Sequence, residues 1–317
     1  MILIALILFA ALVFFGGSYY AYYIAFHSPK NARGKIPSTS GALYDPYRPR
    51  MKEVWDQLVE RPFETVTIRS KEGLSLSGRY YHIQDGAPLV IGFHGYRSHP
   101  LTDFSGGSEL IFQMGYNLLL PDQRAHHSSE GTAISFGIQE RWDVKSWAEY
   151  AVARFGSNVQ ILLMGISMGG ATVLMVSELP LPEQVRGIVS DCPYAIPEAI
   201  ILEVGKKEHY PSWLIRPFLH IGAKIYGGFT LSETNAVQAV KNTRLPILII
   251  HGEADSFVPC QMSVQAYDVC AGKKQLLTFP DAEHGVSFLA DGFRYTAAVI
   301  DFLKENIPGF ETPGSRK

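Results

Sequence analysis

Continuously apolar stretches alternate with helical patterns over most of this chain, and this alternation restricts its fold more than any other feature. The apolar stretches are as long as single strands and lack the in-out alternation of a strand with one wet face. They lie at 87–93, 116–122, 159–165, 185–191, 246–252 and 273–279. The helical patterns lie at about 104–114, 138–155, 168–178, 260–271 and 290–305. Strands joined by helices in this way form parallel sheets that are covered on both faces.

Two leading stretches differ from these apolar runs. Residues 64–70 and 74–83 alternate apolar and polar side chains, which is typical of half-buried antiparallel strands. Hydrophobic residues make up 47% of the 317 residues and charged residues 18%, which fits a globular protein with an additional apolar segment. We therefore predict an α/β domain at 61–317, with a mostly parallel central sheet flanked by helices.

One connection, between the strands that end at 191 and begin at 246, is much longer than the others. It contains more than fifty residues, many of them aromatic, and has helical patterns of its own. We predict a small helical cap at about 193–243, over the carboxyl ends of the strands, where ligands bind in open α/β sheets. Trp213 is its bulkiest apolar side chain, and we expect it either to line a pocket or to pack the cap onto the sheet.

The apolar segment lies at the amino terminus. Residues 2–26 carry no charge and are long enough to cross a hydrocarbon core of about 30 Å. A cleaved signal peptide is the alternative, but no Lys or Arg precedes the segment and no small-x-small cleavage site is evident. Four tyrosines at 19–23 are typical of an interfacial aromatic belt. We predict a single-pass transmembrane anchor at 1–27, then a linker and leading helix at 28–60.

The distribution of charge indicates the orientation of the anchor in the membrane and disfavours nucleic acid as a partner. Lys30, Arg33 and Lys35 follow the anchor, so the positive-inside rule places the rest of the chain on the cytoplasmic side of the cell membrane. A net charge of −2 without a long basic run does not favour nucleic-acid binding. Three cysteines without paired spacing predict no disulfide framework, and no obligate protein partner is indicated.

The stretch ILLMGISMGG at 161–170 contains the pattern G-x-S-x-G directly after an apolar strand. This pattern is typical of a nucleophile elbow, a tight strand-to-helix turn that exposes a serine hydroxyl above the sheet. Because glycine and serine are common, the pattern alone is only suggestive. A serine nucleophile also needs a base, and the base needs an orienting carboxylate.

Two loops supply these partners in the order that this architecture requires, which is serine, acid, histidine. Asp255 follows the strand at 246–252, and His284 follows the last strand. We therefore predict a catalytic triad of Ser167, Asp255 and His284. Asp191, at the end of the strand after the elbow, is the alternative acid, and chain order favours Asp255.

An oxyanion hole needs two backbone N–H donors. The residue after the nucleophile, Met168, supplies one, and the loop at 92–100 supplies the other, for which we predict Tyr96. His94 is expected to brace this loop through hydrogen bonds. His94, His99, His126 and His127 lack the spacing of a metal site, so we predict neither a metal nor a cofactor.

These residues resemble the α/β-hydrolase superfamily over about 60–307. The stretch 121–132 resembles a D-x-R-x-x-G-x-S segment of its lysophospholipase and serine-aminopeptidase-like branch, with His127 where that branch usually has glycine. The stretches 190–195 and 210–218 resemble bacterial, membrane-anchored, YqkD-like hydrolases. The resemblance implies the same triad and the same two oxyanion donors, and it identifies no substrate.

We therefore expect a serine hydrolase, a carboxylesterase that cleaves a small-molecule acyl ester through an acyl-enzyme. A peptidase or amidase, a lysophospholipase or an acyltransferase would use the same triad and stays an alternative. A binding protein on an inactive hydrolase fold is disfavoured because the predicted triad is intact.

Overall fold

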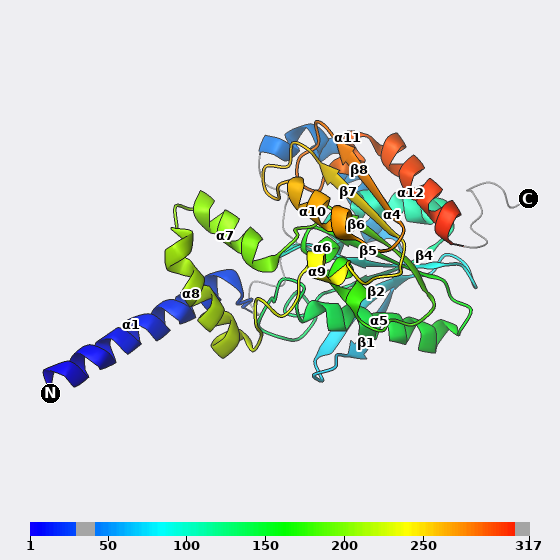
Figure 1. Cartoon of the computed structure of the whole chain (residues 1–317). Helices are drawn as coiled ribbons and strands as arrows, with labels where there is room; N and C mark the ends of the chain where they lie inside the picture. Colours follow the sequence, from blue (N-terminus) through cyan, green and yellow to red (C-terminus); the bar gives the residue numbers. More distant parts are fainter. Residues whose placement is uncertain (30–41, 308–317) are drawn as a thin grey trace, which may run out of the picture.

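The computed structural model describes residues 1–29 and 42–307, and in these residues eight strands form one sheet (Figure 1). The strand order is β1-β2-β4-β3-β5-β6-β7-β8, in which β2 is antiparallel to both of its neighbours and every other pair is parallel. The strands are β1 (Glu64–Arg69), β2 (Ser75–Tyr81), β3 (Leu89–Phe93), β4 (Asn117–Pro121), β5 (Ile161–Ile166), β6 (Val185–Asp191), β7 (Ile247–Gly252) and β8 (Lys274–Phe279). The predicted α/β class and mostly parallel sheet are confirmed.

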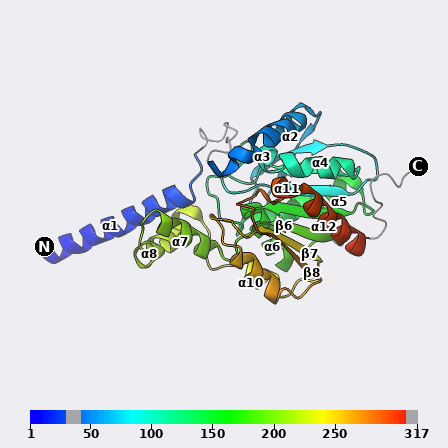
Figure 2. The same ribbon diagram turned by 90° about the horizontal axis from the view of Figure 1, so that it is seen from above.

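Helices cover both faces of the sheet (Figure 2). On one face lie α5 (Glu140–Phe155), α6 (Met168–Met175), α9 (Ala236–Ala239) and α10 (Gln261–Val269). On the other lie α2 (Arg48–Glu60), α3 (Pro100–Asp103), α4 (Ser105–Gln113), α11 (Ser287–Ala290) and α12 (Gly292–Asn306). Two short 3-10 helices, η2 (Ala42–Tyr47) and η3 (Val176–Glu178), precede α2 and follow α6.

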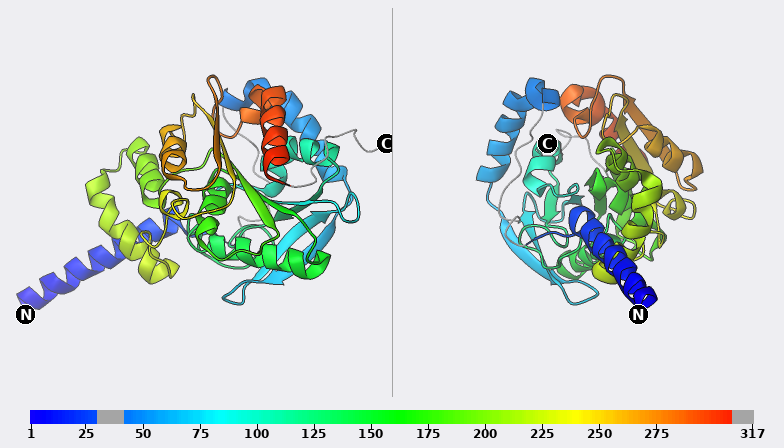
Figure 3. Two further views of the ribbon diagram at one scale, coloured as in Figure 1. Left: turned by 45° about the vertical axis from the view of Figure 1, so that its right-hand side comes forward. Right: turned by 90° about the vertical axis from the view of Figure 1, so that its left-hand side faces the viewer.

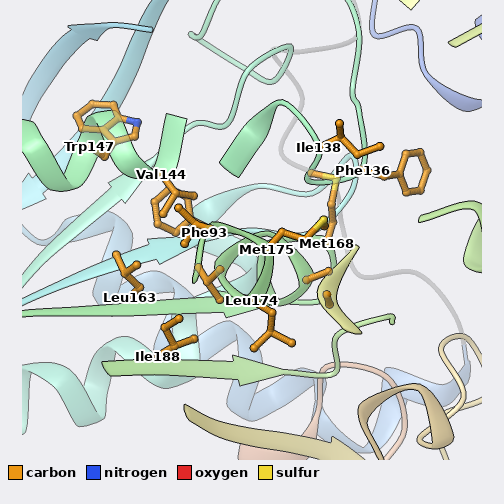
Figure 4. Packing of buried hydrophobic residues seen from close by; sticks show 14 of the residues in the cluster. Phe93, Phe136, Ile138, Val144, Trp147, Leu163, Met168, Leu174, Met175 and Ile188 are labelled. Atoms are coloured by element: carbon orange, nitrogen blue, oxygen red, sulfur yellow. The ribbon is translucent and has the colours of Figure 1, made fainter. Parts of the chain in front are cut away.

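The apolar strands feed two separate cores because successive side chains of a strand point to opposite faces. Leu163 of β5 belongs to the core beneath α5 and α6, and its neighbour Leu162 belongs to the core beneath α4 and α12. Figure 4 shows the first core, where Phe93 of β3 and Ile188 of β6, the strands on either side of β5, lie near Leu174 of α6. A strand buried on both faces must be apolar throughout, which explains the runs in the sequence.

The cap consists of α7 (Pro197–Lys207), α8 (Ser212–Gly222) and the π-helical turn η4 (Ala223–Gly227), which stand away from the sheet (Figure 3). The rest of the predicted cap segment returns to the main body, where Ala236, Ala239 and Val240 are fully buried. Trp213 is 79% exposed, so it does not pack the cap onto the sheet, and it lines neither of the two cavities at Ser167. Both expectations for Trp213 are wrong.

The amino-terminal helix α1 (Ile2–Ala25) is long and apolar enough to cross a membrane, as is also true of a signal sequence. Its first fifteen residues are almost all exposed and project away from the body (Figure 1). The basic residues Lys30, Arg33 and Lys35, which predict its orientation, lie outside the described residues.

The end of α1 behaves differently, because it is built into the folded domain. Tyr22 is buried, and Phe26 is fully buried with its ring centre 5.2 Å from that of Phe229. The chain then pairs with the loop before α5, where Ser28 N–H donates to Thr132 O and Ile134 N–H donates to Phe26 O. The segment predicted as the anchor, 1–27, therefore includes residues that are part of the folded domain.

Deletion of residues 2–15 is expected to leave a folded domain, whereas deletion of 2–27 is expected to destabilise it. The longer deletion removes Phe26, and the loss of a buried phenylalanine costs about 3–5 kcal/mol. Urea unfolding of the two proteins measures the difference, with Phe26→Ala in the shorter deletion as the matched variant. Equal stability of the two deletions would contradict this view of α1.

Candidate active site

Ser167 lies at a sharp turn between β5 and α6. Its backbone has φ 57° and ψ −115°, a conformation that a residue with a Cβ rarely adopts. The turn is possible because a Cβ at Gly165 would collide with Gly169, and one at Gly169 would collide with the Phe93 carbonyl. Ser167 N–H donates to Asp191 O at 2.9 Å, which fastens the turn to β6. This is the geometry of a nucleophile elbow.

Two loops bring the predicted partners to Ser167. The loop after β8 carries His284, whose Nε2 lies 2.9 Å from Ser167 Oγ. The loop after β7 carries Asp255, whose Oδ2 lies 2.7 Å from His284 Nδ1. Three residues far apart in the sequence thus form one hydrogen-bonded chain at the carboxyl ends of the strands.

Asp255 is held as a carboxylate by its surroundings. Burial raises the pKa of Asp255, but hydrogen bonds from His251 and His284, together with the N–H of Val258, more than offset this and leave the pKa well below its usual range. Phe257 N–H and Val258 N–H both donate to Oδ1, while Oδ2 faces His284. A buried anion at this point stabilises a positively charged imidazole.

His251 is a residue of the site that the sequence analysis did not single out. It is fully buried at the end of β7, and its Nε2 lies 2.9 Å from Val258 O and 3.2 Å from Asp255 Oδ2. Its Nδ1 lies 2.6 Å from Ser263 Oγ. In the sequence, only its position four residues before Asp255 indicates such a role. His251 positions the Asp255 loop and does not reach Ser167.

Asp191, the alternative acid, lies in a different environment. Its carboxyl group is buried, makes a hydrogen bond with Tyr295, and leaves Oδ1 without a partner in the part of the chain that the structure describes. Burial raises the pKa of Asp191 to about 6. His284 Nδ1 donates its hydrogen bond to Asp255 and not to Asp191.

The loop after β3 lies against the elbow. Its Gly95 approaches so closely that a Cβ there would lie 3.3 Å from Ser167 Cβ. Asp103 fixes the loop by accepting from Gly95 N–H and Ser98 Oγ, each at 2.6 Å. The N–H groups of Tyr96 and Met168 donate to no other group within residues 1–29 and 42–307. They remain the candidate oxyanion donors.

The clustered histidines are committed to hydrogen bonds. His94 Nε2 accepts from Gln123 N–H while its Nδ1 lies 2.9 Å from Gly95 O, so it braces the loop as expected. His126 Nε2 accepts from Arg97 N–H, and His99 Nδ1 accepts from Leu101 N–H. Burial lowers the pKa of His99 to about 3 and lowers that of His94 well below its usual value, so both rings are neutral.

His127, where the resembling branch usually has glycine, has φ 35°, in the left-handed region that glycine favours. One set of atoms has the spacing of a metal site, since ligand atoms of Cys192, Asp255 and His284 lie within 4.8 Å of one another. Burial raises the pKa of the Cys192 thiol, which keeps it neutral. The other two residues are hydrogen-bonded to each other, and His284 is also hydrogen-bonded to Ser167. These groups do not fit a bound cation.

Two cavities meet at Ser167, and Tyr96 and Phe257 also line both. The smaller, of about 250 Å³, has a mixed lining, in which polar groups of Tyr44, Ser98, Thr102 and Asp103 lie among apolar side chains such as Phe288. The larger, of about 480 Å³, is almost entirely apolar. Its cap-side wall is formed by Ile200, Ile201, Val204, Gly205, Tyr210, Leu214, Ile215, Phe218 and Leu219. Its opposite wall is formed by residues of α1, namely Gly17, Tyr20, Ala21, Ile24 and Ala25.

This sheet, with an elbow serine beneath a helical cap, is the architecture of the α/β-hydrolase superfamily, and the chain is a member of YqkD-like type. It belongs to the prolyl oligopeptidase family, whose sequence model matches residues 133–309, more than half of the chain.

Individual relatives are distant but extend over most of the chain. YqkD of Bacillus subtilis (strain 168) is 25% identical over 252 residues, which cover 79% of this chain and 81% of that protein. Protein bem46 of Schizosaccharomyces pombe is 25% identical over 265 residues, or 80% of each chain. The solved structure of the Pyrococcus furiosus esterase Pf2001 is 20% identical with a TM-score of 0.62, covering 86% of this chain and 98% of that one, and shows the fold.

The raised pKa of Asp191 predicts a pH-dependent stability. Because the folded pKa of about 6 exceeds the unfolded value of about 3.9, the folded state binds the proton more tightly. The contribution of this group to stability is therefore complete below pH 4 and is lost as the pH rises through 6, by about 3 kcal/mol in all.

Asp191→Asn removes this dependence. Its free energy of unfolding, relative to the parent protein, should rise by about 1 kcal/mol between pH 5 and pH 8. Urea unfolding at the two pH values measures it, with the exposed Asp301→Asn as the control. A difference that is constant with pH would contradict the assignment.

Proposed function

We propose that this protein is a serine hydrolase that cleaves carboxylic esters with apolar acyl groups. The observation that carries the proposal is the hydrogen-bonded chain Ser167–His284–Asp255 at the mouth of an apolar cavity. A serine hydroxyl is a weak nucleophile unless a base within about 3 Å removes its proton, and His284 lies at that distance.

The reaction proceeds in two halves. His284 Nε2 takes the proton of Ser167 as Oγ attacks the ester carbonyl carbon, and the resulting imidazolium is stabilised by the buried carboxylate of Asp255. His284 then gives this proton to the departing alcohol, which leaves an acyl-serine. Water, deprotonated by His284, attacks the acyl-serine, and the proton returns to Ser167 as the carboxylic acid is released.

The tetrahedral intermediate places a negative charge on the former carbonyl oxygen. We assign its stabilisation to the N–H groups of Tyr96 and Met168, which flank Ser167 and have no competing acceptor in the described residues. The larger, apolar cavity is assigned to the acyl group, and the smaller cavity, whose lining is mixed, is assigned to the alcohol. No cofactor or metal takes part in these steps.

A peptidase is the second candidate, because the matching sequence model is that of the prolyl oligopeptidase family. A bound peptide brings backbone N–H and C=O groups that are costly to bury without partners. Arg97 and Glu208 are the only charged residues that line the larger cavity in the described part of the chain. This favours an ester with a hydrocarbon acyl group over a peptide.

The amino-terminal helix is proposed to anchor the enzyme in the cell membrane as a single uncleaved span. Its length and composition support this, and the basic residues that follow support a cytoplasmic catalytic domain. We propose that the protein acts on a small molecule, without nucleic acid and without an obligate protein partner.

Ser167→Ala is expected to lower kcat for ester hydrolysis by at least 10³-fold and to leave the fold intact, because the elbow accepts alanine. The assay uses p-nitrophenyl butyrate alongside a prolyl peptide amide, and a fluorophosphonate probe measures labelling of Ser167. The amide should be cleaved far more slowly than the ester. An Ala variant that keeps most of its esterase activity would rule out the mechanism.

Asp255→Asn is expected to reduce kcat by about 10³–10⁴-fold, since His284 loses the anion that holds and stabilises its charged form. Asp191→Asn, a matched change of a buried neighbour, should reduce kcat less than tenfold. The comparison is made with both proteins folded by circular dichroism. Equal losses would show that Asp191 serves as the acid.

A further inference from the structure

We propose that the substrate is a single-chain lipid ester whose acyl chain enters the larger cavity directly from the bilayer, between α1 and α8. This inference rests on the proposed function and specifies its substrate class. The observation behind it is that the helix expected to anchor the protein is also a wall of the cavity at Ser167. Figure 3 shows α1 lying against the cap helices.

The contact between α1 and α8 is close and specific. A Cβ at Gly17 would lie 3.0 Å from the Phe218 ring, and one at Gly222 would collide with the Ser18 carbonyl. Tyr96 joins the same wall to the reaction centre, because its hydroxyl donates to Ala25 O at 2.9 Å while its backbone lies beside Ser167. The helix is therefore a fixed part of the site.

The length of α1 determines how deep the cavity lies. The helix α1 has 24 residues, and a helix that spans the hydrocarbon core needs about 20 of them. Any 20 consecutive residues of α1 include Tyr20 and Ala21, so a span formed by α1 places both in the hydrocarbon. Both residues line the cavity. A bilayer crossed by α1 thus reaches the cavity wall.

The cap has an exposed apolar surface, as expected if it lies at the membrane interface beside α1. Trp213, Leu214, Ile225 and Tyr226 are exposed on α8 and η4, and the Tyr226 ring lies 5.2 Å from that of Tyr19 on α1. Aromatic and aliphatic side chains beside a spanning helix are typical of the membrane interface. The interface position also explains why Trp213 contacts neither the sheet nor the cavity.

The cavities limit the substrate to one acyl chain. The apolar cavity of about 480 Å³ leads from Ile24 and Tyr20 to Ser167. A second cavity at Ser167, of about 250 Å³, has about half this volume and is too small for a second chain of the same length. Ser98, Thr102 and Asp103 in its mixed lining can form hydrogen bonds with an alcohol. A monoacyl ester of a polar alcohol fits this arrangement, and a diacyl lipid does not.

The first test uses the full-length protein in phosphatidylcholine vesicles that contain 1-monopalmitoylglycerol. Trp213→Ser combined with Ile225→Ser should lower kcat/KM for this substrate about tenfold and leave hydrolysis of soluble p-nitrophenyl butyrate unchanged. Phe293→Ser, which alters an equally exposed apolar residue on α12, is the control and should change neither rate. Equal rates for the double variant and the parent on the vesicle substrate would overturn the proposal.

The second test concerns the wall. Ala21→Phe should lower the ratio of palmitoyl to butyryl ester hydrolysis at least tenfold, because the added ring occupies the path of a long chain. Ala10→Phe, on the exposed part of α1, should leave the ratio unchanged. An unchanged ratio in Ala21→Phe would refute the route. Absence of butyrate hydrolysis and of fluorophosphonate labelling in the parent protein would instead refute the proposed esterase itself.

Discussion

The close approach of α6 to β5 and β3 is the constraint on which the site depends. Gly165 and Gly169 have no room for a side chain, and their small size lets the chain turn with Ser167 in a strained conformation at φ 57°. Burial of the helix pays for that strain, because every residue of α6 is buried. The serine hydroxyl is thereby held above the edge of the sheet, and its N–H is tied to β6.

The electrostatics of the site depend on two buried carboxyl groups, Asp255 and Asp191. Burial raises the pKa of both, and hydrogen-bond donors more than offset this effect only at Asp255. Asp255 accepts from two backbone N–H groups and lies beside His251 and His284, so its pKa stays low in spite of burial. Asp191 has one oxygen without a partner in the described residues, and burial raises its pKa to about 6. Two aspartates after neighbouring strands thus differ in proton affinity, because Asp255 has several hydrogen-bond donors and Asp191 has few.

The amino-terminal helix connects the site to its surroundings. Its first part has the composition of a membrane span, and its last turns belong to the folded domain through Tyr22 and Phe26. The same turns form a wall of the apolar cavity at Ser167. The proposed anchoring and the proposed substrate binding therefore depend on one element, and the contact of α1 with α8 fixes the position of the cap relative to that element.

The sequence by itself determined the strands, the sheet class and the order of Ser167, Asp255 and His284. These depend on local patterns: apolar runs, glycine spacing, and the position of polar residues after strands. It did not determine the partners of Asp191, the role of His251, the exposure of Trp213 or the use of α1 as a cavity wall. Those depend on contacts between segments far apart in the chain. No local pattern encodes such contacts, because an apolar helix has the same kind of sequence whether lipid, a cap or a substrate covers its face.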